Sequence, residues 1–235
     1  MKWTVQGPLG LTCDPSLHSD YPCYASCDFS GDCSYNENAC TFTSCHDDIE
    51  YTQRVLYDIL DRWCVDTDQI HMSGASNGGM FIYSKALESL AGTLASVGPV
   101  CGAPLLGFNP MPDTPVSIID FHGLDDDTIP WSPEVAGNLG AGPHDTVEAT
   151  DGWYYHIKME HLKQIITHMN CNPEAQEYPT HMDGTDGWVC QLWSGCDAGK
   201  EVVQCNANYG HDYPFSSSYI DGVQILWNFM KAHPR

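Results

Sequence analysis

The sequence predicts an α/β fold in which a mainly parallel sheet is flanked by helices. Short apolar runs rich in β-branched residues alternate with segments of helical periodicity, a pattern typical of strands joined by crossover helices. The pentapeptide at residues 74–78, Gly-Ala-Ser-Asn-Gly, stands between one such run and one such helix. An apolar content of 42% is enough for one core, so we treat residues 1–235 as a single domain.

The expected elements follow one another in the order that this fold requires. Apolar residues spaced three or four positions apart predict helices, and short apolar runs between loop formers predict strands. Residues 137–152 are rich in Gly, Pro and acidic residues and predict an excursion from the sheet. The expected helices cover residues 47–63, 77–92, 153–169 and 219–230, and the expected strands cover residues 69–73, 94–97, 116–121, 188–193 and 201–205.

The pentapeptide predicts a nucleophilic serine. A sharp turn from a strand into a helix raises a serine hydroxyl above the sheet edge, and flanking glycines allow the tight backbone. Ser76 occupies that position, and the backbone N–H of Asn77 would be one oxyanion donor. The alternative is an ordinary glycine-rich turn in which Asn77 caps the following helix.

Partners for such a serine follow it in the chain in the order acid, then histidine. The strand at residues 116–121 runs into an acidic loop at residues 125–127, and the strand at residues 201–205 is followed by His211. The carboxyl ends of parallel strands share one edge of a sheet, where open α/β folds place their sites. We therefore expect both loops to approach Ser76.

Three motifs resemble the secreted α/β-hydrolases that include polyhydroxybutyrate depolymerases and feruloyl esterases. The segment IHMSGASNGGM is similar to the nucleophile segment of this family. FHGLDDDTIPW is similar to its His-Gly-x-x-Asp loop, and NYGHDYPF to its Gly-His-x-x-Pro segment with the catalytic histidine. HDDIEYTQRVLYDIL also resembles the helix before the nucleophile. The resemblance spans residues 47–214 and implies an α/β-hydrolase-type sheet.

Residue by residue, the resemblance implies a triad of Ser76, His211 and Asp126. His211 would take the Ser76 proton during attack on an ester carbonyl, and Asp126 would orient the imidazole. Motif spacing favours Asp126 over its two acidic neighbours, and His122, which precedes the loop, is expected to be structural.

Two of the site assignments have alternatives. The carboxylates at residues 125–127 could be solvated charges or turn formers. A calcium loop is a further alternative, although the alternating oxygen donors and the closing Glu that it needs are missing. Trp131 is a candidate substrate-binding residue, because it and the aromatic residues 153–155 could line a cleft; aromatic residues at helical spacing could equally belong to the core.

The first 46 residues differ from the catalytic core that we expect at residues 47–235. They are rich in Cys, Pro, Gly and polar residues, without the two or three hydrophobic strands that open an α/β-hydrolase. We expect those strands and their oxyanion loop to be missing, or this Cys-rich, loop-rich segment to replace them. An apolar leader after Lys2 is also absent from the sequence.

Twelve cysteines in 235 residues indicate disulfides formed in an oxidising compartment, and hence a secreted, extracellular protein. Seven lie within residues 1–64 and five follow, so complete pairing would require at least one bridge between the two groups. A zinc site is the alternative, but no C-x-x-C pair occurs, and we expect neither a metal nor a cofactor. The ligands of such a zinc site would be Cys23, Cys27, Cys40, Cys45 and His46.

The balance of 31 acidic against 9 basic residues gives a formal net charge of −22. This charge disfavours nucleic acids and anionic membrane surfaces as partners, and no apolar run is long enough to span a bilayer. The resemblance implies a serine carboxylic-ester hydrolase that acts on a polymer-linked ester of plant walls or microbes, with feruloyl esterase preferred over polyhydroxybutyrate depolymerase. The rival hypothesis is a non-catalytic secreted binding or structural module that keeps the fold.

Overall fold

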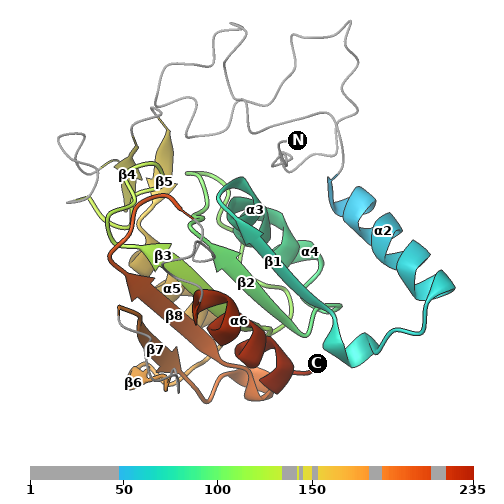
Figure 1. The fold of residues 1–235 in the computed structure, drawn as a ribbon. Helices are drawn as coiled ribbons and strands as arrows, with labels where there is room; N and C mark the ends of the chain where they lie inside the picture. The colour runs from blue at the N-terminus through green and yellow to red at the C-terminus, as the bar shows by residue number, and fades with distance from the viewer. Residues whose placement is uncertain (1–47, 134–141, 143–144, 150–152, 180–186, 213–220) are drawn as a thin grey trace, which may run out of the picture.

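The computed structural model describes the chain from residue 48 onward, with five interruptions (Figure 1). The Cys-rich segment of the first 46 residues lies outside the described part, as does most of the excursion expected at residues 137–152. The described residues are 48–133, 142, 145–149, 153–179, 187–212 and 221–235.

Six strands form one central sheet. In spatial order they are β1 (His71–Ala75), β2 (Ser96–Val100), β3 (Ser117–Gly123), β8 (Val202–Ala207), β7 (Val189–Trp193) and β6 (Gln176–Glu177). The first four are parallel to one another, whereas β7 is antiparallel to β8 and β6 is antiparallel to β7. The mainly parallel sheet that the sequence predicts is thus present.

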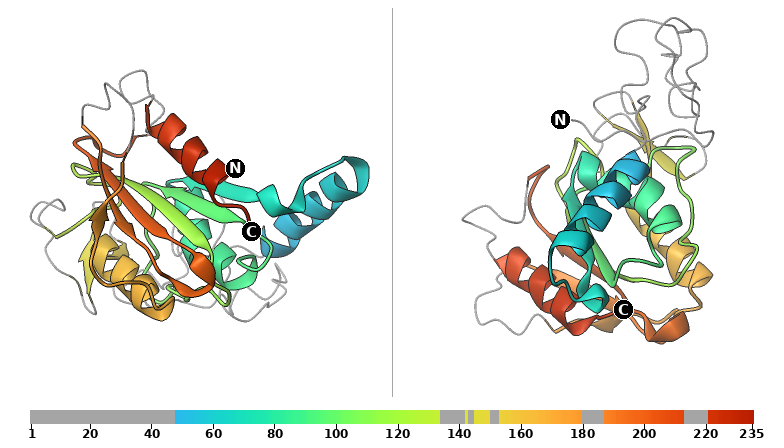
Figure 2. Two further views of the ribbon diagram at one scale, coloured as in Figure 1. Left: turned by 90° about the horizontal axis from the view of Figure 1, so that it is seen from below. Right: turned by 90° about the vertical axis from the view of Figure 1, so that its right-hand side faces the viewer.

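Helices cover both faces of this sheet (Figure 2). On one face lies α6 (Asp221–Ala232), and on the other lie α3 (Asn77–Phe81), α4 (Leu87–Ser89) and α5 (Lys158–His168). A π-helical segment, η3 (Ile82–Ala86), joins α3 to α4, so helical backbone continues from Asn77 to Ser89. Short 3-10 turns complete the described elements at Thr67–Gln69 (η2) and Asp197–Gly199 (η4).

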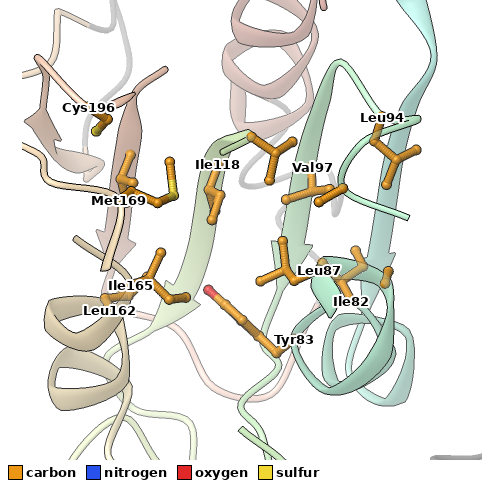
Figure 3. Packing of buried hydrophobic residues seen from close by; sticks show 14 of the residues in the cluster. Ile82, Tyr83, Leu87, Leu94, Val97, Ile118, Leu162, Ile165, Met169 and Cys196 are labelled. Carbon is orange, nitrogen blue, oxygen red and sulfur yellow. The ribbon is translucent and has the colours of Figure 1, made fainter. Parts of the chain in front are cut away.

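The core has one hydrophobic layer on each side of the sheet. Successive residues of a strand point to opposite faces, so Ile118 packs toward α5 and η3, and Ile119 packs toward α6. Figure 3 shows the first layer, in which Ile118 and Val97 face Leu162 of α5 and Leu87 of α4. These four side chains are fully buried. Because the strands are buried on both faces, they are continuous apolar runs in the sequence.

The helix expected before β1 is formed as α2 (Asp48–Arg62), but its apolar stripe is not buried. None of its residues is buried within the described part of the chain, and Tyr51, Tyr57 and the following Trp63 are more than half exposed. In Figure 1 this helix projects away from the sheet beside β1, which is an edge strand among the described strands. A helix buries its stripe only where another element covers it; among the described residues only Ile49, at the start of this helix, packs against the core.

The prediction of a helix at residues 153–169 is wrong for its first residues. Residues 154–156 form strand β5 (Tyr154–His156), which pairs antiparallel with β4 (Thr146–Glu148), and α5 begins only at Lys158. Trp153 and Tyr155 are buried in a small hydrophobic cluster, so they belong to the core and not to a substrate cleft. Cross-strand pairing and burial therefore override the local helical spacing.

Four of the described cysteines form disulfides. Cys190–Cys205 joins directly opposed residues of β7 and β8, and Cys171–Cys196 joins the loops after α5 and β7. The other two, the exposed Cys64 and the buried Cys101, are free thiols, so pairing is incomplete. Each bridge is expected to stabilise the fold by about 2–4 kcal/mol.

A fully buried ion pair connects the sheet to the helices on one face. Lys158 of α5 lies 2.8 Å from Asp120 of β3, and both side chains are completely inaccessible to solvent. Asp120 also accepts hydrogen bonds from the Tyr83 hydroxyl and, at 2.9 Å, from Gln204 Nε2 of β8, while Lys158 donates to the Gly102 carbonyl. Burial of two charges is tolerated because each is paired and hydrogen-bonded.

Replacing Lys158 should therefore be strongly destabilising. Lys158→Met leaves the Asp120 carboxylate buried without its counter-ion, and we expect the free energy of unfolding to fall by about 3–5 kcal/mol. Lys163→Met on the same helix is the matched control, because Lys163 pairs with Glu160 at the exposed surface, and a change within about 0.5 kcal/mol is expected there. Urea unfolding measures both; equal losses would show that the buried pair contributes no more than the exposed one.

The two free thiols should differ in reactivity. Burial raises the pKa of the Cys101 thiol to about 11, so it stays protonated and unreactive at pH 8, whereas Cys64 is exposed. We expect iodoacetamide to alkylate Cys64 in the native protein and to reach Cys101 only after unfolding in urea. Peptide mass spectrometry distinguishes the two sites, and rapid alkylation of native Cys101 would contradict its burial.

Candidate active site

Three loops at the carboxyl ends of parallel strands bring the sequence-predicted residues together. Ser76 directly follows β1, Asp126 lies in the loop after β3, and His211 lies in the loop after β8. The distance from Ser76 Oγ to His211 Nε2 is 2.8 Å, and that from His211 Nδ1 to Asp126 Oδ2 is 2.9 Å. These residues thus form one hydrogen-bonded line at the edge where open α/β sheets place their sites.

Ser76 occupies a strained turn between β1 and α3. Its φ of 54° and ψ of −119° lie in a region that side chains other than glycine rarely adopt. Its N–H donates to the Val100 carbonyl at 2.8 Å, which ties the turn to the neighbouring strand. A Cβ on Gly74 would lie 2.7 Å from the backbone of Gly78, so this turn requires glycine there. The local geometry is that of a nucleophile elbow.

The hydrogen-bond geometry fixes the direction of proton donation. A carboxylate only accepts, so His211 Nδ1 carries the hydrogen that is donated to Asp126. His211 Nε2 then has a free lone pair and accepts the hydrogen bond from the Ser76 hydroxyl. The side chain of Asp126 is fully buried, and that of His211 is 22% exposed. The imidazole can thus exchange protons with a molecule that reaches the surface of the site.

The acidic loop presents one of its three carboxylates to the histidine. Asp126 is buried, and its Oδ1 accepts the backbone N–H groups of Thr128 at 3.0 Å and Ile129 at 2.9 Å. Asp125 and Asp127 are exposed. Burial and hydrogen bonding therefore distinguish Asp126 from its two acidic neighbours. Asp126 is also the residue that motif spacing favours.

Backbone hydrogen bonds join the acid loop to the histidine loop. Leu124 N–H donates to the Ala207 carbonyl at 2.9 Å, and Asp125 N–H donates to the Tyr209 carbonyl at 3.1 Å. Both acceptors lie at the end of β8 or just beyond it, in the segment that leads to His211. The two loops consequently hold a fixed spacing that does not depend on the triad side chains.

Cys101 is a residue of the site region that the sequence-based reasoning missed. It follows β2, and its Sγ lies 3.2 Å from the Asp212 carbonyl and 3.7 Å from the Tyr209 hydroxyl, on either side of His211 in the sequence. Burial also raises the pKa of Tyr209, so the hydroxyl stays neutral. The available signal was its position four residues after the strand predicted at residues 94–97, which a count of cysteines for disulfides does not use.

The remaining expected site residues are Asn77 and Trp131. Asn77 directly follows Ser76 and is the first residue of α3. The N–H groups of the first helical turn have no acceptor within the helix, and that of Asn77 is one of them. Trp131 is partly buried, and its ring lies 5.9 Å from that of His122, on the flank of the acid loop. Residues 1–46, which were expected either to lack the second oxyanion loop or to replace it, lie outside the described residues.

The described residues offer neither a cluster of metal ligands nor a membrane-spanning helix. No group of three or more His, Cys, Asp or Glu side chains there is arranged to hold a metal ion. Every helix there is too short or too polar to cross a membrane.

The chain is similar to two fungal esterases. Over 186 residues it is 29% identical to a bifunctional acetylxylan esterase/xylanase of Neocallimastix patriciarum, an alignment that covers 78% of this chain and 23% of that protein. Over 190 residues it is 24% identical to feruloyl esterase B of Piromyces equi, with 79% of this chain and 31% of that protein covered. The chain thus spans less than a third of either relative. No family model matches it.

Proposed function

We propose that this chain is a secreted serine carboxylic-ester hydrolase of the α/β-hydrolase type, acting on an ester of a plant-wall polysaccharide. The observation that carries the proposal is the hydrogen-bonded line from Ser76 through His211 to Asp126, with the serine on a strained turn. The two relatives, an acetylxylan esterase/xylanase and a feruloyl esterase, support the substrate class. We favour feruloyl esters.

The proposed reaction uses each side chain in the orientation found. Ser76 Oγ attacks the ester carbonyl while His211 Nε2 takes its proton, and the N–H of Asn77 donates to the developing oxyanion. His211 then returns the proton to the departing sugar oxygen, which leaves an acyl group on Ser76. A water molecule, deprotonated by His211, attacks this acyl-enzyme and releases the free acid. Asp126 orients the imidazole and stabilises its cation throughout.

The strained serine favours catalysis over the rival hypothesis of a non-catalytic module. A backbone conformation such as that of Ser76 costs about 1–3 kcal/mol and persists only where the surroundings impose it. A binding or structural module gains nothing from raising one hydroxyl toward an imidazole at this cost. An acyl-transfer enzyme does, because the turn makes the oxygen accessible and places an N–H donor next to it.

Secretion is part of the proposal for a separate physical reason. The disulfides Cys171–Cys196 and Cys190–Cys205 persist in oxidising compartments and are rare in the reducing cytosol. The net charge of −22 is compatible with a protein that stays soluble outside the cell and avoids nucleic acids.

Covalent labelling tests the nucleophile directly. We expect a fluorophosphonate to modify Ser76 stoichiometrically, as mapped by peptide mass spectrometry, and Ser76→Ala to abolish both labelling and hydrolysis of methyl ferulate or 4-nitrophenyl acetate. Ser73→Ala is the matched control, because this serine lies on the same strand and its hydroxyl donates to the Gly98 carbonyl. A label on another serine, or an unchanged rate in Ser76→Ala, would refute the assignment.

The three adjacent carboxylates should respond differently to amidation. Asp126→Asn removes the acceptor for His211 Nδ1–H and favours the wrong tautomer, so we expect the turnover number to fall by about 10⁴-fold. Asp125→Asn and Asp127→Asn alter exposed side chains and should change it little. Steady-state kinetics with an aryl ester measures all three. A comparable loss at Asp125 or Asp127 would show that another carboxylate partners the histidine.

A further inference from the structure

His122 is a fully buried imidazole immediately before the acid loop. It lies on β3, whose two neighbours in the sheet are β2 and β8, and it is in register with Asn206 of β8. Its side chain is completely inaccessible to solvent. A side chain on a central strand has little freedom to move, because the backbone is held by hydrogen bonds on both sides.

Two contacts connect this imidazole to the loop that carries Asp126. His122 Nε2 lies 2.8 Å from the Ile129 carbonyl oxygen and 3.4 Å from Asp126 Oδ2. A carbonyl only accepts, so Nε2 carries the hydrogen and donates it. Ile129 in turn donates its own N–H to Asp126 Oδ1. The ring therefore anchors Ile129, whose N–H binds the carboxylate, and its Nε2 also lies near the Asp126 oxygen that faces His211.

The imidazole makes these contacts in its neutral form. Burial, followed by the positive charge of Lys158, lowers the pKa of His122 to about 4, although Asp120 and Asp126 oppose this shift. Nδ1 has no hydrogen-bond partner among the described residues, which agrees with a ring protonated on Nε2 alone. His122 is thus a fixed neutral donor near neutral pH and does not compete with His211 for a proton.

We propose that His122 is a positioning residue that aims Asp126 at His211 by anchoring the Ile129 carbonyl to strand β3. This inference rests on the proposed function, in which Asp126 is the acid of the triad. It differs from the purely structural role expected from the sequence, because loss of the Nε2 donor should disturb the His211–Asp126 hydrogen bond even in a protein that remains folded.

Three substitutions separate positioning from packing. His122→Gln keeps an N–H donor that can reach the Ile129 carbonyl, whereas His122→Met fills similar volume and has no donor. His161→Met is the matched control, since His161 is another fully buried imidazole, lies on α5 and has two ring nitrogens without hydrogen-bond partners among the described residues. Urea unfolding of all three reports how much stability each substitution removes.

The expected kinetic result is a selective loss of turnover. In His122→Met we expect kcat to fall about 10²-fold with KM nearly unchanged, because a misaimed carboxylate weakens stabilisation of the transition state and not substrate binding. His122→Gln should restore most of kcat, and His161→Met should keep the wild-type kcat. A wild-type kcat in His122→Met, or a His122→Gln no better than His122→Met, would overturn the proposal.

A spectroscopic readout makes the test independent of turnover. The proton shared by His211 Nδ1 and Asp126 should give a low-field NMR signal that is absent in His211→Ala, is retained in His122→Gln and His161→Met, and shifts or broadens in His122→Met. If the signal responds in this way but no ester is hydrolysed, the positioning role stands and the proposed function fails. If the signal is unchanged in His122→Met while stability falls, His122 is merely structural.

Discussion

The arrangement of the site depends on the buried Asp126 carboxylate, both oxygens of which accept hydrogen bonds. Oδ1 accepts two backbone N–H groups of its own loop, and Oδ2 faces His211. A carboxylate buried without such partners would cost several kcal/mol, so the loop after β3 has few alternative conformations. Because β8 is the parallel neighbour of β3, the loop that bears His211 is delivered to the same place.

Strand β3 supplies two buried carboxylates that serve different purposes. Asp120 lies within the strand and binds Lys158 of α5 and the Tyr83 hydroxyl, so it fixes the helices on one face. Tyr83 belongs to the helical stretch that begins just after Ser76, and this contact therefore also stabilises the element that follows this serine. Asp126 lies beyond the carboxyl end of the strand and faces the site. One rigid strand thus links the packing of the core to the placement of the proposed catalytic residues.

The sequence predicts the order of the elements well because strand and helix patterns are local. Ser76 and His211 could be assigned because each follows a predicted strand, and motif spacing selected Asp126 from three candidates; their catalytic roles remain predictions. The strand Tyr154–His156 could not be foreseen, since its identity depends on pairing with Thr146–Glu148. The burial of Lys158 was equally hidden, because a lysine at the start of a helix appears exposed until its partner Asp120 is placed beside it.

Ser76 directly follows β1, which lies at the sheet edge among the described strands, so the described sheet supports it from one side. That side is β2, whose last residue, Val100, accepts the N–H of Ser76. A Cβ on Gly79 would lie 2.9 Å from the same Val100 carbonyl, and a Cβ on Gly102 would lie 2.6 Å from the backbone of Gly79. The backbone of α3 thus rests directly on the chain leaving β2, at a separation that no other residue allows. This close contact holds the strained serine in place from the β2 side.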